Sequence, residues 1–406
     1  MVRETLVSGI DVLLAIAAFI FLGLSAWFCL EVLAALLPIR SQLNQPSRSR
    51  STVAVLMPAH NEEVCLDETL ANLQTELKSL KHPVRLVVVA DNCTDSTATI
   101  ARSAGAIVLE RHDLTRVGKG YALDYGLRYL AADAPDIVVL VDADCWVESG
   151  AIANLVDCVR ASGRPAQATY LMTKPPAPRA KDAVSVFGFT VKNLVRPLGL
   201  LRLGLPCLLT GTGMAFPWTA LRSVELANGH LVEDMKLSLD LTIAGCAPVY
   251  CPQARVIGQL PQHDRAARSQ RTRWEHGHLQ SILTYVPALV KTAILKRRPE
   301  ALALALELSI PPMALFVMLW LALWAICLGW GLISGGWSAA ILATAAGACL
   351  IAGVVLAWAK FGKRDLSLNQ LLSIPFYILW KIPLYFQFLV RPQRSWVRTE
   401  RNASSK

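Results

Sequence analysis

The apolar residues of this chain gather at its two ends, and this uneven distribution constrains the fold more than any other feature. Of the 406 residues, 54% are hydrophobic, and the mean hydropathy is +0.42. The excess lies in residues 7–37 and again in the last quarter, whereas the middle has the composition of an ordinary globular domain. Since roughly 20 consecutive apolar residues cross the hydrocarbon core of a bilayer, the sequence predicts a membrane protein with one large domain outside the bilayer.

The sequence predicts three membrane spans, at residues 7–37, 310–333 and 337–359. A cleaved signal peptide has a shorter apolar region that ends at a small-residue cleavage site, so the first block is expected to be a retained anchor. The Pro311-Pro312 pair suits the start of the second span, because proline fits the first turn of a helix but not its interior. The third span is rich in Ala and Gly, which permit close contact between helices.

A further apolar segment, residues 369–390, is interrupted by Pro375, Lys381 and Pro383. Because a charge in the middle of the bilayer is costly, we expect this segment to lie in the membrane interface or to re-enter it. A fourth crossing is the alternative.

Basic residues follow the first and third spans, whereas the loop between the second and third spans carries no charge. They are Arg40, Arg48 and Arg50 after the first span, and Lys360, Lys363 and Arg364 after the third. Since Lys and Arg are enriched on the cytoplasmic side of membrane proteins, the sequence predicts a cytosolic middle domain with Met1 outside. The expected location is the inner or plasma membrane, crossed several times.

The net charge of +10 raises the question of a nucleic-acid partner. Much of the basic excess lies next to apolar segments, where it would meet anionic lipid headgroups, and no RNA- or DNA-binding motif accompanies it. We therefore expect membrane lipids as partners and no nucleic acid. Segments 184–205 and 281–298, which mix basic and apolar residues, are expected to touch the headgroups; packing within the domain is the alternative for the second.

These features divide the chain into six parts. They are an N-terminal transmembrane helix (1–38), a linker (39–51), a cytosolic domain (52–280), an amphipathic interface helix (281–300), two transmembrane helices (301–359), and an interfacial or re-entrant segment with a basic tail (360–406).

Strand and helix patterns alternate through the first half of the cytosolic domain. Buried strands are expected at 53–57 (ended by Pro58), 84–89, 107–109 and 137–141, with helices at 67–80, 96–104 and 119–132. Short connections between such elements are typical of an α/β fold, with a Rossmann-like, mostly parallel sheet covered by helices on both faces. Because ligands bind at the carboxyl ends of the strands in such sheets, the residues after each strand are the candidates for chemistry.

Polar residues follow three of these four strands. Pro58-Ala-His60-Asn-Glu62 follows the first, Asp91 begins the run after the second, and Asp142-Ala-Asp144 follows the fourth. An Asp after a strand is usually a turn or helix cap, and we assign that role to Asp95. Carboxylates at i and i+2 instead offer two hard oxygen ligands on one side, which suits Mg²⁺ or Mn²⁺ holding a diphosphate. Asp142 and Asp144 are therefore the candidate metal ligands.

Four further motifs follow in order. They are Gly118-Lys119-Gly120, Thr210-Gly211-Thr212-Gly213, Glu233-Asp234 and Gln270-Arg-Thr-Arg273-Trp274. With the residues after the strands, this series resembles the inverting glycosyltransferase family 2 with its GT-A fold, over about residues 50–280. The Q-x-x-R-W element resembles that of membrane polysaccharide synthases, such as those for cellulose, hyaluronan, chitin oligosaccharides and poly-N-acetylglucosamine. Asp-x-Asp alone is a weak signal, whereas all the motifs in this order between these spans are a specific one.

The resemblance implies a division of roles among the motif residues. Donor contacts are expected from Pro58, His60, Glu62, Asp91, Lys119, Asp142 and Arg273, and acceptor contacts from Gly211, Thr212, Gly213, Glu233, Gln270 and Trp274. The carboxylates of Glu62 and Asp91 can accept hydrogen bonds from a nucleoside, and the Arg273 guanidinium offers a fork of donors to phosphate. The flat face of Trp274 suits stacking against a sugar.

Asp234 is the expected catalytic base. Inversion at the anomeric carbon requires the acceptor hydroxyl to attack opposite the leaving group, and a carboxylate on that side takes its proton. The alternative is that Glu233-Asp234 only caps the helix that follows. Its position between the Gly-rich loop and Gln270 favours the catalytic role.

The sequence thus predicts a hexosyl- or N-acetylhexosaminyltransferase that uses a nucleoside-diphosphate sugar and Mg²⁺ or Mn²⁺. The acceptor stays open between a growing surface polysaccharide, which Q-x-x-R-W favours, and a polyprenyl-linked oligosaccharide, which the small number of spans favours. Three spans hardly enclose a polymer channel, so polymer synthesis would need an export-channel partner or a homo-oligomer. A transporter or channel subunit is a remote alternative, because the spans have almost no polar residues to line a path.

Overall fold

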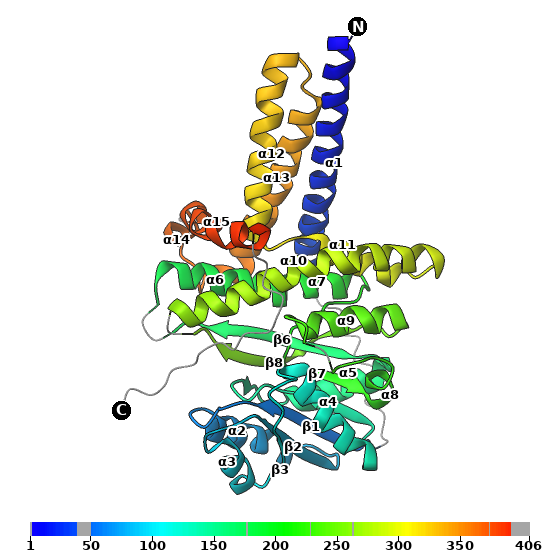
Figure 1. Ribbon diagram of the computed structural model, residues 1–406, viewed down its shortest axis with the longest axis vertical. Coiled ribbons are helices and arrows are strands. Elements are labelled where there is room, and N and C mark those ends of the chain that lie inside the picture. The colour runs from blue at the N-terminus through cyan, green and yellow to red at the C-terminus, as the bar shows by residue number, and fades with distance from the viewer. Residues whose placement is uncertain are drawn as a thin grey trace.

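The structure, a computed structural model, describes residues 2–38, 50–175, 178–227, 229–261, 264–372 and 374–390. Most of the predicted linker (39–51) and all of the basic tail after residue 390 lie outside these residues. In Figure 1 the described chain forms three tiers: an upright helical bundle, a layer of helices across its base, and a sheet with its covering helices.

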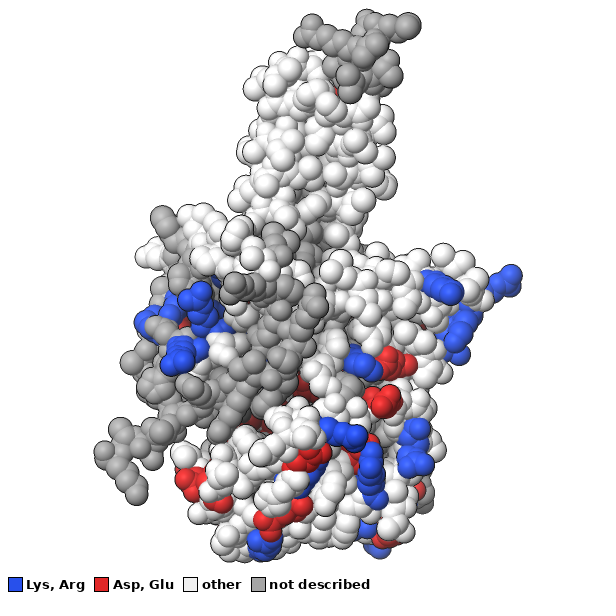
Figure 2. All heavy atoms as spheres, in the orientation of Figure 1, with Lys and Arg blue, Asp and Glu red and all other residues white. Residues whose placement is uncertain are grey.

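The upright bundle consists of α1 (Val2–Leu36), α12 (Met313–Ser334) and α13 (Ser338–Ala357). All three helices are long and apolar enough to cross a membrane, and the described part of the face in Figure 2 carries almost no charged side chain there. Small residues let the helices approach closely. A Cβ atom on Gly347 would clash with the Trp320 ring, and one on Gly353 would clash with Phe28.

The lowest tier is built on one sheet, whose order among the described residues is β3-β2-β1-β4-β7-β6-β8-β5. The strands are β1 (Val53–Ala59), β2 (Val84–Asp91), β3 (Ile107–Arg111), β4 (Ile137–Leu140), β5 (Trp146–Val147), β6 (Ala166–Thr173), β7 (Met214–Pro217) and β8 (Val249–Gln259). The first four strands run parallel to one another, which confirms the predicted α/β fold. Pro58 lies within β1 rather than ending it. Because β4 stops opposite Leu56, β1 has a neighbour on only one side at Pro58, where proline is tolerated.

Helices cover both faces of this sheet. They are α2 (Leu66–Lys78), α3 (Thr97–Ser103), α4 (Lys119–Leu130), η1 (Ala131–Asp133), α5 (Ala151–Ser162), α8 (Trp218–Leu221) and α9 (Glu233–Ala244). Alternate residues of β1 point to opposite faces, so Val55 and Met57 join one core with α2, α3 and α5. Ala54 and Leu56 join a second core with α4 and α9. Burial on both faces explains the continuous apolar runs of the parallel strands.

The second half of the sheet is mixed in direction, and the sequence patterns did not predict it. β7 lies antiparallel between β4 and β6, and β5 lies antiparallel to β8, whereas β6 and β8 are parallel. This half extends the sheet toward the crosswise helices (Figure 1).

The crosswise layer lies between the bundle and the sheet (Figure 1). It contains α6 (Ala180–Thr190), η2 (Val191–Val195), α7 (Arg196–Arg202), α10 (Asp264–Leu295), α11 (Pro299–Ser309), α14 (Leu368–Leu372) and α15 (Ile374–Val390); η3 (Trp358–Gly362) continues α13 into it. Residues 181–202 also have the length and composition of a span, but 67% of that window is buried inside the protein. α10 runs without a break through the Q-x-x-R-W element and most of the segment predicted as a separate interface helix.

The prediction that segment 184–205 turns its basic side chains to lipid headgroups is wrong for Arg196 and Arg202. The Nε of Arg196 donates to Glu31 Oε2 at 2.7 Å, and its Nη2 donates to Glu307 Oε2 at 2.6 Å. All three side chains are at most 7% exposed. Arg202 donates to backbone carbonyls at the carboxyl end of α1. A carboxylate buried near the end of α1 needs a cation, and Arg196 supplies it; the contact ties α1 to α7 and α11.

Candidate active site

The ends of β1 and β2 bring His60 and Asp91 together. The Nδ1 of His60 lies 2.5 Å from the backbone oxygen of Asp91, to which it donates. The Asp91 carboxylate is paired with Arg111, at 2.6 Å from its Nη1, and each side chain is only 8% exposed. Burial raises the pKa of Asp91 although Arg111 opposes this rise. The predicted nucleoside-binding carboxylate is therefore held by a buried cation from the neighbouring strand.

Glu62 connects this group with the acidic pair after β4. The backbone N–H of Glu62 donates to Thr97 Oγ1 at 2.8 Å, which fixes the turn after β1. The Sγ of Cys65 lies 3.4 Å from Glu62 Oε2 and 3.7 Å from the carbonyl oxygen of Ala143, which stands between Asp142 and Asp144. The loops after β1 and β4 are thus in contact, as expected for neighbouring parallel strands.

Lys119 is the centre of the second group of predicted residues. It begins α4, forms an ion pair with Asp142, and donates from Nζ to the carbonyl oxygen of Gly211 at 2.8 Å. The backbone N–H of Asp142 donates to Thr212 Oγ1 at 3.0 Å. The Gly-rich loop is therefore bound to both Lys119 and Asp142. The structure therefore brings three separately predicted motifs into one cluster.

Glu233 and Asp234 occupy the first turn of α9, with Val232 rather than either acid as the capping residue. Their carboxylates are near the positive end of the helix, which favours negative charge. The Asp234 carboxylate lies beside Gly211 and Lys119. A Cβ atom added to Gly211 would lie 3.3 Å from Asp234 Oδ2 and 3.9 Å from Lys119 Nζ.

The charges of this cluster are coupled. Burial by itself would lower the pKa of Lys119, but the carboxylates of Asp142, Glu233 and Asp234 outweigh it and raise that pKa. Burial raises the pKa of Glu233, and the Asp234 carboxylate raises it further, while Lys119 and Arg273 oppose the rise. The raised pKa favours the charged form of Lys119 among these carboxylates.

The Q-x-x-R-W residues approach from α10. Gln270, Arg273 and Trp274 share one face of this helix, because residues three and four positions apart are neighbours. The Nε of Arg273 is buried without a hydrogen-bond partner among the described residues, although its charge acts on Glu233. A buried guanidinium nitrogen without an acceptor fits a site for an anionic group. The Trp274 ring packs against Phe189, with centroids 5.9 Å apart.

Asp142 and Asp144 suit a divalent cation better than their neighbour Cys145 does. One ligand atom from each of these three residues lies within 4.8 Å of the others. Burial, followed by the Asp144 carboxylate, raises the pKa of Cys145 well above its usual value, so the thiol stays protonated. Mg²⁺ and Mn²⁺ prefer carboxylate oxygens. The donor set that fits such an ion is the aspartate pair.

Two buried residues that support the site were not predicted from the sequence. Gln167 in β6 is 1% exposed; its Oε1 accepts from the Thr210 N–H at 2.9 Å, and its Nε2 donates to Thr212 O at 3.0 Å. These two hydrogen bonds hold the Gly-rich loop, residues 210–213, in place against β6. Arg111, the partner of Asp91, ends a short apolar strand. The register places it directly opposite Asp91, but the sequence gives no sign of that pairing.

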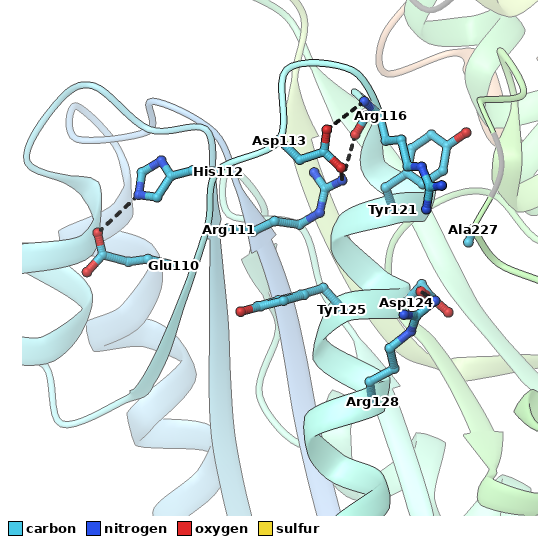
Figure 3. A pocket seen from close by; sticks show the side chains of 10 residues that line it. All are labelled: Glu110, Arg111, His112, Asp113, Arg116, Tyr121, Asp124, Tyr125, Arg128 and Ala227. Atoms are coloured by element: carbon cyan, nitrogen blue, oxygen red, sulfur yellow. Dashed lines mark hydrogen bonds and ion pairs between the residues drawn. The ribbon is translucent and has the colours of Figure 1, made fainter.

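A pocket of about 290 Å³ opens beside the Asp91–Arg111 pair, between the end of β3 and α4 (Figure 3). Its lining residues are Glu110, Arg111, His112, Asp113, Arg116, Tyr121, Asp124, Tyr125, Arg128 and Ala227. None of the predicted donor or acceptor residues lines it. Arg111 and Asp113 connect it with the site, through Asp91 and Asn92, respectively. The Arg111 guanidinium lies 5.8 Å from the centroid of the Tyr121 ring. The pocket is a neighbour of the site rather than the site itself.

Replacing Gly211 with Ala is expected to reduce turnover strongly. Its φ of +98° costs about 1–3 kcal/mol for a residue with a side chain, and the new Cβ would press on the Asp234 carboxylate. If Asp234 is the base, as the sequence predicts, its displacement would lower the rate on the order of 100-fold. Gly163→Ala is the matched control, because Gly163 also has a positive φ (+66°) but open space around it. Equal turnover of the two variants in a transfer assay would contradict the role of Gly211.

Comparison with known proteins finds glycosyltransferases among the relatives of this chain. YaiP of Escherichia coli K12, an uncharacterized glycosyltransferase, is 27% identical over 264 residues, which cover 61% of each chain. Agl6 of Haloferax volcanii, a hexosyltransferase of low-salt glycan biosynthesis, is 33% identical over 118 residues, 29% of this chain and 27% of Agl6. The chain thus spans less than two thirds of the length of these relatives.

A solved structure and a family match extend the comparison. The mannosyltransferase PcManGT of Pyrobaculum calidifontis, solved with GDP-Man and Mn²⁺, shares the fold at a TM-score of 0.50 and 19% identity, covering 87% of this chain and 99% of its own. The family described as "Glycosyltransferase like family 2" matches residues 50–277, which contain every motif residue discussed above. Since the matched residues make up more than half of this chain, the chain belongs to the glycosyltransferase-like family 2.

Proposed function

We propose that this protein is a membrane-embedded inverting glycosyltransferase, which transfers a hexose or N-acetylhexosamine from a nucleoside-diphosphate sugar to a growing surface polysaccharide. The main support for this proposal is one cluster of side chains. In it, Lys119 contacts both Asp142 and Gly211, and the Asp234 carboxylate lies beside Gly211. A cation that can bind a diphosphate and a carboxylate that can take the proton of an acceptor hydroxyl thus lie within one site.

The donor is assigned to the cluster and to the ends of β1 and β2. Glu62 and Asp91 would contact the nucleoside, supported by Pro58 and His60, while Lys119 and Arg273 hold the diphosphate by charge. Asp142 and Asp144 would hold Mg²⁺ or Mn²⁺, which supplies Lewis-acid neutralisation of the leaving diphosphate. PcManGT, which shares the fold, was solved with a nucleotide sugar and Mn²⁺.

The transfer step is assigned to Asp234. The acceptor hydroxyl attacks the anomeric carbon opposite the leaving group, and Asp234 takes its proton. Glu233, Gln270, Trp274 and the 211–213 loop would orient the acceptor. Because Lys119 is held in its charged form by three carboxylates, it stays an electrostatic partner of the phosphates throughout.

The membrane assignment rests on the bundle. α1, α12 and α13 would cross the bilayer of the inner or plasma membrane, with the sheet in the cytosol and the crosswise helices at the headgroups. In this arrangement the acceptor side of the site, on α9 and α10, faces the lipid surface, where a membrane-bound acceptor would arrive.

A second acceptor class is a polyprenyl-linked oligosaccharide that receives one sugar. The packing of Trp320 on Gly347 and Phe28 on Gly353 favours it, because helices in such close contact leave little room for a polymer between them. Polysaccharide synthesis would then require an export-channel partner or a homo-oligomer.

Membranes that contain the protein, offered labelled nucleotide sugars with Mg²⁺ or Mn²⁺, test the proposal. We expect label in product from at least one donor, and its loss when EDTA removes the divalent ion. Label in a high-molecular-weight fraction would assign polymer synthesis, and label confined to the organic extract would assign single addition. Absence of transfer from every donor, with both acceptor classes supplied, would contradict the enzymatic proposal and revive the transporter alternative.

A further inference from the structure

The carboxyl-terminal helix α15 connects the bundle with the helix that carries Arg273 and Trp274. On one side it packs on the start of α12, where Ile378 and Leu384 meet Ala314. It also contacts α10, through Lys381 and the backbone of Leu384. The two contacts place α15 between the membrane anchor and the Q-x-x-R-W element.

The contact with α10 is a buried ion pair between Lys381 and Glu275. Their side chains are 9% and 10% exposed, respectively. The Tyr385 hydroxyl is buried beside the pair, and burial followed by the Glu275 charge raises its pKa. Loss of either partner would leave an uncompensated buried charge, which is energetically costly. The pair therefore resists separation of α10 from α15.

Neighbouring contacts fix the same stretch of α10. The Nε2 of His276 donates to the carbonyl oxygen of Leu384 at 3.2 Å, and its ring lies 5.1 Å from that of Phe388. One turn earlier, the Arg271 guanidinium lies 5.8 Å from the Tyr377 ring. Residues 271, 275 and 276 are thus all in contact with α15.

On the side of α10 that carries Arg273 and Trp274, the Trp274 ring packs against Phe189, which is a weaker restraint than a buried ion pair. Arg273 and Trp274 are one or two positions from Glu275, so the orientation of the backbone at Glu275 sets where they point. The Nε of Arg273 has no partner among the described residues that would hold it independently. A misplacement of about 1 Å at a reacting centre can cost 10²-fold in rate.

We propose that Lys381 and Glu275 are positioning residues, which orient Arg273 and Trp274 for transfer without touching either substrate. This inference rests on the proposed function, because it assigns a role in that reaction. It also assigns a role to Lys381, whose charge in an apolar segment would otherwise be only a cost.

The test compares Lys381→Met, Glu275→Gln and the charge-swapped double variant Glu275→Lys/Lys381→Glu. Each single variant is expected to lower kcat on the order of 100-fold. Donor KM is expected to rise as well, because Arg273 is assigned to the donor diphosphate, and hydrogen exchange at residues 270–276 is expected to speed up. The swapped pair restores opposite charges and is expected to recover most of the lost kcat. Lys174→Met is the control: Lys174 also contacts the carboxyl-terminal region, through Asp365 at 3.7 Å, but this pair is partly exposed.

Unchanged kcat in both single variants would overturn the proposal, as would a loss that follows thermal stability alone and is not recovered by the swap. Failure of the proposed function has a different result. The wild-type protein itself would then transfer no sugar, while the exchange difference at 270–276 between wild type and Lys381→Met would persist.

Discussion

Asp234→Asn is expected to lower the rate of sugar transfer by roughly 10²–10⁴-fold, the usual contribution of a general base. The amide keeps the size of the side chain but cannot take the proton of the acceptor hydroxyl. The Lys119–Asp142 pair and the Gly211 contact of Lys119 remain, so donor binding is expected to persist. Single-turnover transfer and nucleotide binding, measured on the same preparation, separate the two effects.

Asp240→Asn is the matched control for this change. Asp240 lies on the same helix α9, where its partly buried carboxylate pairs with Lys236 and interacts with Tyr285 of α10. Its loss is expected to lower stability slightly and to leave the transfer rate of the folded protein unchanged. The neighbouring residue Glu233 allows a result that would contradict Asp234 as the base. If Asp234→Asn retained full activity while Glu233→Gln lost it, the base would be Glu233, whose pKa is raised by burial.

Arg196→Met is expected to cost about 3–5 kcal/mol of folding free energy, the typical cost of breaking a buried ion pair from one side. Both Glu31 and Glu307 would be left with buried charge, since they are at most 4% exposed. The change would loosen α1 from α7 and α11. Thermal or denaturant unfolding in detergent measures it, together with the yield of folded protein.

Arg128→Met is the control for this second prediction. Arg128 is 73% exposed and pairs with Asp124 one turn away, so its replacement is expected to change stability by at most about 0.5 kcal/mol. Replacing Glu31, Arg196 and Glu307 together by Met is expected to recover most of the loss, because no buried charge then remains. Unchanged stability of Arg196→Met would show that the ion pairs of Arg196 with Glu31 and Glu307 do not hold α1 against α7 and α11.

The first half of the fold and most of the candidate site followed from local sequence patterns. Residues 53–141 alternate between apolar strands and amphipathic helices, and the sheet edge where ligands bind is set by that order alone. That order predicts Asp142, whereas the resemblance to family 2 predicts Lys119 and Gly211, and the structure brings the three together. The mixed strands after β4 were not predictable in this way, since their order depends on pairings between distant segments.

By itself, then, the sequence determined the class of the protein: the apolar ends, the α/β core and the motifs that place it in family 2. Only the tertiary structure decided how those motifs are supported. Gln167 under the Gly-rich loop, Arg111 on Asp91, Arg196 between two glutamates and Lys381 on Glu275 are all pairings across the fold. Periodicity records which face of an element is buried, but it carries no information on which distant charge will meet it there.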